Sequence, residues 1–188
     1  MKIPELKIWM ETITHNLIAV IIQILCFKFL LFPLNIILTI IFSFISHIFF
    51  DAIAVITYHT PKAQRRDRFW IVWHVLIYSV SIISTIIFFI PFWLSLLFAN
   101  IMDIWDWLIL RPIQKKKKIR KPNSQWGENF YLHIIVDWFR KTFFNWLPKW
   151  NYKKSAVFIE ISIILCLILI IFPIYWFPYY IKSLNCLK

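Results

Sequence analysis

The chain has a single glycine among its 188 residues, and this scarcity excludes several folds and sites. Tight β-hairpins rely on glycine in their turns, so a sheet-rich fold is not expected. The sequence also has no glycine-rich phosphate loop, no serine-hydrolase elbow and no HExxH zinc motif. Its three cysteines do not have the spacing of a metal site. Any chemistry must therefore rest on other residues.

Apolar residues dominate the chain. Hydrophobic residues make up 61% of it, whereas an average soluble domain is about 45–50% apolar. A helix that crosses a membrane needs about 20 mainly apolar residues. We therefore predict an all-α, multi-pass transmembrane helical bundle. Its five predicted spanning helices are 14–32, 34–58, 69–90, 92–110 and 155–179.

Proline and charge set the predicted topology. Pro33 and Pro91 each separate two spans, which predicts two tight helical hairpins. Basic residues gather between the second and third spans and between the fourth and fifth. The positive-inside rule places these loops and the N-terminus in the cytoplasm, and the C-terminus outside. The segment 131–147 mixes apolar and polar residues at helical spacing, which predicts an amphipathic helix in the cytoplasmic interface.

Three regions follow from this topology. Residues 1–112 form a four-helix membrane core that carries a cluster of histidine and aspartate. Residues 113–154 form a basic cytoplasmic loop with the interfacial helix, and residues 155–188 form a C-terminal transmembrane helix with a short tail. The basic run 115–121 favours attraction to anionic lipid headgroups over binding of nucleic acid, because it directly follows a membrane helix.

Ionisable residues inside apolar runs are costly and usually mark a site. His47 and Asp51 are four residues apart, so they share one helix face. Together they can bind a metal, or the carboxylate can orient the ring. The structural alternative is a hydrogen-bonded pair that holds two helices together. We predict the functional role.

Asp103 and Asp106 are three residues apart and also share a helix face. Two carboxylates so close together in an apolar setting repel each other unless a cation or a proton lies between them. We therefore predict a cation or a proton shared by Asp103 and Asp106. The alternative for Asp106 is a place among the lipid headgroups beside the neighbouring tryptophans.

The predicted topology brings these residues and all five histidines to the cytoplasmic side. Histidine with carboxylate is a ligand set for a divalent metal, and zinc is the metal we predict. Asp106 is the predicted general base or a further ligand. Arg65, Arg66 and Arg111 are predicted to attract a phosphate-bearing headgroup. The predicted metal ligands are His15, His47, Asp51, His74 and Asp103. The interfacial helix brings His133 and Asp137 near them without an assigned role.

Three of these motifs together resemble a known family. They are Thr14-His15, the segment Ser46-His47-Ile-Phe-Phe-Asp51 and the acidic Asp103-Ile-Trp-Asp106. They resemble the membrane-bound, metal-dependent hydrolases, the family of the LexA-binding inner-membrane hydrolase-like protein. The resemblance covers residues 11–112 and implies a multi-helical fold with a metal at membrane-embedded histidines and aspartates. The family's acidic box usually reads Pro-Asp-x-Asp-His, whereas no histidine follows the acids here.

Two functions remain open at this stage. The first is a metal-dependent hydrolase that acts on a lipid or amphiphile at the cytoplasmic leaflet. The second is a non-catalytic scaffold or small transporter whose polar cluster fixes helix packing or relays protons. Membrane lipids are the partners expected in either case.

Overall fold

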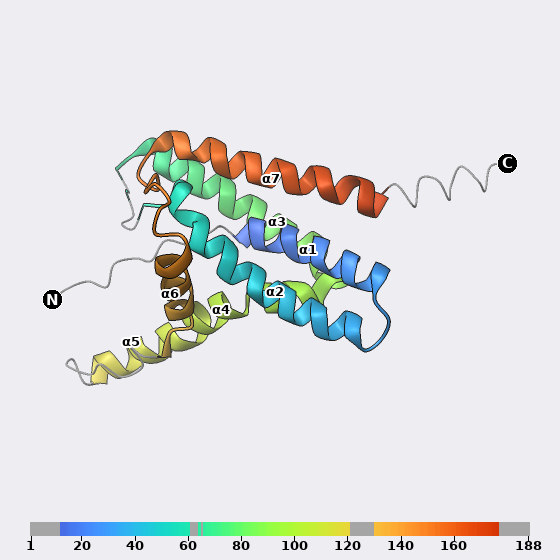
Figure 1. The fold of residues 1–188 in the computed structure, drawn as a ribbon. Helices are drawn as coiled ribbons and strands as arrows, with labels where there is room; N and C mark the ends of the chain where they lie inside the picture. The colour runs from blue at the N-terminus through green and yellow to red at the C-terminus, as the bar shows by residue number, and fades with distance from the viewer. Residues whose placement is uncertain (1–11, 61–63, 65, 121–129, 177–188) are drawn as a thin grey trace.

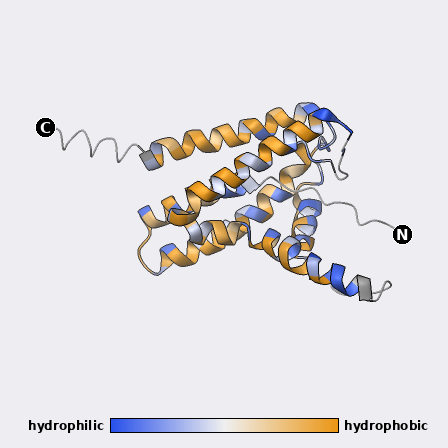
Figure 2. Ribbon diagram, turned by 180° about the vertical axis from the view of Figure 1, so that it is seen from behind, coloured by the Kyte–Doolittle hydropathy of each residue, from blue (hydrophilic) through white to orange (hydrophobic). Residues whose placement is uncertain are grey.

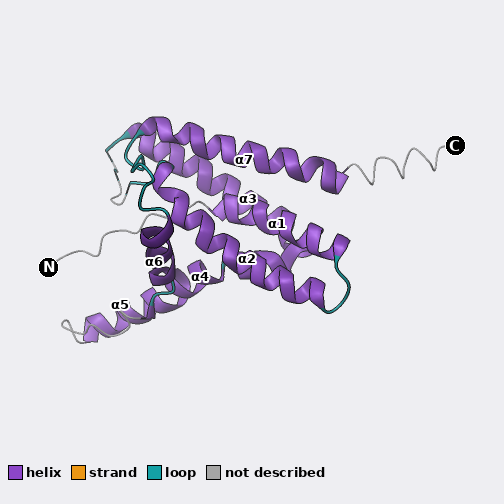
Figure 3. Cartoon of the chain, viewed as in Figure 1, coloured by secondary structure: helices purple, strands orange, loops and turns teal. Residues whose placement is uncertain are grey.

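The computed structural model describes residues 12–60, 64, 66–120 and 130–176, and no strand is present in these ranges (Figures 1 and 3). This confirms the predicted all-helical class. The principal helices, in chain order, are α1 (Thr12–Phe29), α2 (Leu34–Ile53), α3 (Arg68–Ala99), α4 (Ile101–Asp103), a π-helix (Ile104–Leu110), α5 (Arg111–Arg120), α6 (His133–Phe143) and α7 (Val157–Ile171).

Four of the described helices are long and apolar enough to cross a membrane. Figure 2 shows that most residues along these helices are hydrophobic. Ile90 and Leu169, for example, are 84% and 70% exposed. Such a surface suits lipid tails, whereas soluble proteins rarely expose apolar patches of this extent. The four segments are Thr12–Phe29, Leu34–Ile56, Arg68–Ala99 and Lys154–Tyr175.

Helix α1 packs against α2, α3 and α7 (Figure 1). Its polar residues Thr14, His15 and Asn16 are fully buried. The hydrocarbon region of a membrane offers no water, so buried polar groups need partners within the protein. Asn16 Nδ2 donates to Ser84 Oγ at 2.9 Å and to Thr85 Oγ1 at 2.8 Å on α3. These bonds fix the level at which α1 and α3 meet.

The long helix α3 folds back on itself after Pro91. Phe92 there has non-helical backbone angles, φ −127° and ψ 27°. Asn16 bonds to Thr85 before the break and accepts a 3.0 Å hydrogen bond from Asn100 after it. On an unbroken helix these two partners of Asn16 would be roughly 22 Å apart, too far for one side chain to bridge. The hairpin predicted at Pro91 is therefore present, with an outgoing arm (68–90) and a returning arm (92–110).

The returning arm is helical but not one regular helix. Asn100 interrupts it with φ −112° and ψ 5°, and the short α4 and the π-helix follow. The predicted fourth span, 92–110, therefore differs from a continuous α-helix. Wider π winding often occurs at functional sites. Here it carries Asp106 and directly follows Asp103.

Helix α6 lies across one end of the bundle and packs on α2 (Figure 1). It buries His133 and Val136 and leaves Trp138 61% exposed. The side chain of Arg140 donates to the carbonyl oxygens of Asp51 and Ala52 near the end of α2. A helix C-terminus attracts a cation, so this arginine holds α6 against α2.

Candidate metal centre

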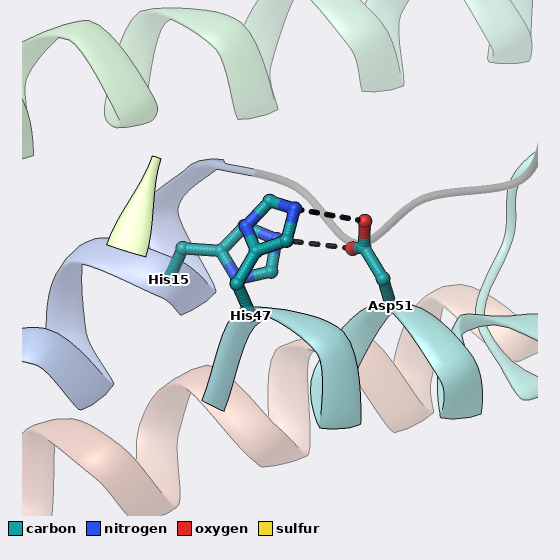
Figure 4. Close-up of side chains that lie close together, drawn as sticks. All are labelled: His15, His47 and Asp51. Atoms are coloured by element: carbon teal, nitrogen blue, oxygen red, sulfur yellow. Dashed lines mark hydrogen bonds and ion pairs between the residues drawn. The ribbon is translucent and has the colours of Figure 1, made fainter. Parts of the chain in front are cut away.

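His15, His47 and Asp51 meet where the start of α1 faces the last turns of α2 (Figure 4). All three side chains are fully buried. His15 Nε2 lies 3.0 Å from Asp51 Oδ1, and His47 Nε2 lies 3.3 Å from Asp51 Oδ2. The two imidazole rings stack with centroids 4.2 Å apart. One carboxylate therefore faces a nitrogen from each of two helices.

The backbone of the returning arm sets the orientation of His47. Its Nδ1 lies 2.6 Å from the carbonyl oxygen of Ala99. A carbonyl only accepts, so Nδ1 carries the proton, and the neutral ring keeps its lone pair on Nε2. That buried Nε2 lies 3.3 Å from Asp51 Oδ2, so a proton or a cation between these two atoms would stabilise the pair. A metal ion would suit Nε2, since a ligating histidine commonly donates its other N–H to a carbonyl.

A second group of donors adjoins the first. His133 Nε2 lies 3.2 Å from Asp51 Oδ2 and 3.4 Å from Asp103 Oδ1. Two groups of three residues each have one ligand atom per residue within 4.8 Å of the others. The first group is His15, His47 and Asp51, and the second is His47, Asp103 and His133. The two groups share His47, so they form one continuous centre. We call it the His/Asp centre.

Asp106 binds the start of α6. Its Oδ1 accepts from the backbone N–H of Leu132 at 2.9 Å, and its Oδ2 accepts from that of His133 at 3.1 Å. The same Oδ2 lies 2.6 Å from His133 Nδ1. A carboxylate is stabilised at a helix N-terminus, so Asp106 both docks α6 and aims His133. This arrangement leaves His133 Nε2 facing Asp51 and Asp103.

The centre holds more negative than positive charge when its histidines are neutral. Asp51, Asp103 and Asp106 supply three carboxylates, of which only Asp103 is partly exposed, at 23%. Burial opposes a charge on His133, but hydrogen bonds to Asp103, Asp106 and Asp51 outweigh it and raise the pKa of His133 to about 11. The pocket therefore favours a positive species, either a proton or a cation.

The donor spacing fits a small metal ion. Two ligands of a tetrahedral zinc at about 2.0–2.1 Å from the ion lie about 3.3 Å apart. The contacts of Asp51 with His15, His47 and His133 are 3.0, 3.3 and 3.2 Å. Imidazole nitrogen with carboxylate oxygen is a ligand set for zinc and for other first-row divalent metals. The described residues that could hold such an ion are His15, His47, Asp51, Asp103 and His133.

Four of the five predicted ligands converge: His15, His47, Asp51 and Asp103. The fifth, His74, is placed elsewhere. Its Nδ1 lies 2.8 Å from the carbonyl oxygen of Trp70, and its ring stacks on that tryptophan. The physical reason is helix length. Ser81 on α3 accepts from the backbone N–H of Ile13 near the start of α1, so the centre lies at the level of Ser81 along α3. His74 is seven residues earlier on the same helix, which places it roughly 10 Å from that level.

His133 takes the place that the sequence analysis gave to His74. Two signals pointed to it, namely its position on the interfacial helix near the cluster and its four-residue spacing from Asp137. Asp137 itself pairs with Arg140 at 3.5 Å and belongs to neither donor group. The missing information was the bond from Asp106 to the backbone of α6, which no sequence spacing reveals.

The three predicted headgroup arginines have different surroundings. Arg65 lies outside the described residues, and Arg66 is exposed. The guanidinium of Arg111 lies 3.2 Å from the centroid of a Trp107 ring, a cation–π contact. Burial lowers the pKa of Arg111 from its ordinary value, although it remains a cation at neutral pH. Arg111 is thus the one of the three that the structure places beside the returning arm.

No protein family, no curated protein and no solved structure matches this chain in the comparisons made with known proteins.

Proposed function

We propose that this chain is a membrane-embedded, metal-dependent hydrolase that acts on a lipid or another amphiphile at the cytoplasmic leaflet. One observation carries the proposal. Three histidines and two aspartates from α1, α2, α4 and α6 form two adjoining, largely buried donor groups that share His47, and each group has its donor atoms within 4.8 Å of one another. Pure helix packing does not require such a set, because a single hydrogen-bonded pair would join two helices.

The membrane placement within this proposal follows the positive-inside rule. In this proposal the returning arm crosses the membrane in addition to the four long helices. The loops on either side of it therefore lie on opposite faces. The end of the bundle that holds the centre also carries the exposed Lys115, Lys116 and Lys117 of α5. Figures 1 and 2 show that the hydrophilic helix α5 lies at the same end of the bundle as α6. We assign that end to the cytoplasm, with α6 in the interface and anionic headgroups as its partners.

Within the centre the side chains have separate tasks. A divalent ion, zinc in this proposal, would supply Lewis acidity toward water and the substrate oxygen. His15, His47, Asp51 and His133 hold the site. Asp103 is the partly exposed carboxylate, so it is the group that exchanges protons with substrate. In hydrolysis of an ester, Asp103 would accept a proton from water as the water oxygen bonds to the carbonyl carbon. The bond to the alcohol oxygen then breaks, and Asp103 would pass that proton to the departing oxygen.

Asp106, the predicted general base, is assigned a positioning task instead, because its oxygens accept three N–H groups at the start of α6. His133 also bears on the resemblance to the membrane-bound hydrolases. The acidic box of that family ends in a histidine. In this chain His133 reaches Asp103 and Asp106 from another helix. This supports the proposed class of chemistry.

Elemental analysis of the purified full chain tests the proposal. We expect about one equivalent of divalent metal per chain, and hydrolysis of p-nitrophenyl laurate that is lost with a chelator and regained with zinc. His47→Ala should remove both the metal and the hydrolysis. His74→Ala is the matched control and should retain both, because His74 belongs to neither donor group. A parent protein that takes up no zinc, manganese or iron would refute the hydrolase and leave the scaffold.

A further inference from the structure

A cavity of about 440 Å³ lies between the outgoing arm, the returning arm and the start of α1. Asp103, a member of the His/Asp centre, forms part of its wall. Small-molecule sites typically have this size and combine apolar walls with a few polar groups. The residues that define its character are Phe89, Leu96, Leu97, Asn100, Asp103 and Trp107.

Three polar residues of the wall form hydrogen bonds with one another. Asn16 donates to Thr85, and Asn100 donates to Asn16. Asn100 also donates to the carbonyl oxygen of Leu96. The buried oxygen Oδ1 of Asn100 has no hydrogen-bond partner within the described residues, so this wall keeps one open acceptor. What remains facing the space is mainly apolar.

The cavity is polar at one end and apolar at the other. Phe89 and Leu97 lie on the two arms next to the Pro91 turn, while Asp103 and Trp107 lie toward the open ends of the arms. Arg111 stacks on Trp107 at this polar end. Phe89 and Leu108 are 54% and 71% exposed, so the wall continues into the apolar outer surface. An amphiphile can therefore enter sideways, from the membrane.

From this arrangement we infer that the cavity binds a single alkyl chain of the substrate, with the tail toward the Pro91 turn and the polar head at Asp103. The position of the head rests on the proposed function, while the tail site rests on the cavity alone. A methylene occupies roughly the volume of a water molecule, about 30 Å³, so the space holds on the order of a dozen carbons. Two chains of a membrane phospholipid would exceed it.

Photolabelling of the purified full chain tests the tail site. The probe is dodecanoic acid with a diazirine at its methyl end, followed by peptide mapping. We expect adducts on Phe89, Leu96 or Leu97, displaced by excess dodecanoic acid and not by butanoic acid. Leu97→Trp and Leu108→Trp fill the cavity from its two ends and should lower the yield about tenfold through lost burial of methylenes. Leu169→Trp, on the outer face of α7, is the matched control and should label like the parent.

The outcomes separate this inference from the hydrolase. Adducts in the cavity of a protein that binds no metal would support the alkyl site while refuting the hydrolase. Adducts confined to outer residues such as Leu169, in a protein that holds zinc and hydrolyses the laurate ester, would overturn the alkyl site and leave the hydrolase standing. Equal displacement by dodecanoic and butanoic acids would also overturn it.

Discussion

Two histidine clusters lie in this molecule, and their surroundings differ. In the His/Asp centre, His15, His47 and His133 face carboxylates. In the second cluster, His74 lies among aromatic rings. It stacks on Trp70 with centroids 4.1 Å apart and has Tyr58, His59 and Tyr78 at 5.9–6.4 Å. Neither donor group found in the described chain includes His59 or His74.

The difference shows what distinguishes a metal ligand from a packed histidine. Both His47 and His74 direct Nδ1 at a backbone carbonyl oxygen, at 2.6 and 2.8 Å. The acceptor of His47 comes from another segment, Ala99, whereas that of His74 is in its own helix, one turn earlier. A ring held by its own helix stays on that helix's surface, while a ring held by a second segment is fixed between elements. Only there can it meet donors from several helices.

The largest expected effect separates a histidine that binds metal from one that only packs. His133→Ala should reduce metal affinity by more than the roughly 10–100-fold that follows loss of a ligand's outer partner. His74→Ala should retain the metal and lose about 0.5–1.5 kcal/mol of stability through the lost ring stacking. Titration with zinc and thermal unfolding of both variants measure the two effects. Equal loss of metal in the two would place His74 in the centre, as the sequence analysis predicted.

A smaller effect is expected from Asp106, which holds His133 without facing the other donors. Asp106→Asn keeps an acceptor for one N–H group of α6 but removes the charge that orients the imidazole. We expect metal affinity to fall about 10–100-fold. Asp137→Asn is the matched control, since this partly exposed carboxylate on α6 lies 3.5 Å from Arg140 and belongs to neither donor group. An unchanged affinity in Asp106→Asn would refute the positioning task.

Much of the fold could be predicted from the sequence because membrane helices are encoded locally. Long apolar runs and prolines identified the helical class and both hairpins, at Pro33 and Pro91. The interruption at Asn100 was not predicted. Asn100 reaches across to Asn16 on α1, so the interruption comes with a contact 84 residues away in the chain. A local pattern contains no such information.

The candidate site was partly predictable for the same reason. His47 and Asp51 share a helix face, and ionisable groups are costly in an apolar run, so they stood out in the sequence. His74 also lay in an apolar run, but its depth depended on where α3 begins relative to α1. His133 lay on an amphipathic helix whose contacts are tertiary. Deciding which of these two histidines joins the centre required knowing at what level α1 and α3 meet. The hydrogen bonds from α1 to Ser81 and Ser84 give that level.

The smallest effect concerns the end of the bundle near His74, where an ion pair stabilises the fold without contacting the centre. Asp67 caps α3 by accepting from Phe69 N at 2.9 Å, and Lys154 Nζ lies 2.6 Å from its other oxygen. The hydrogen bond to Lys154 lowers the pKa of Asp67 below its ordinary value of 3.8. Folding therefore favours the carboxylate, and this stability is present above about pH 4 and is lost as the pH falls through the lowered pKa.

Asp67→Asn keeps the cap but not the charge. Its melting temperature should lie slightly below that of the parent near neutral pH, and the two should converge in acid, with metal content unchanged throughout. A gap that persists in acid would mean that the cap geometry, rather than the charge, supplies the stability. A change in metal content would mean that this end of the bundle is coupled to the centre.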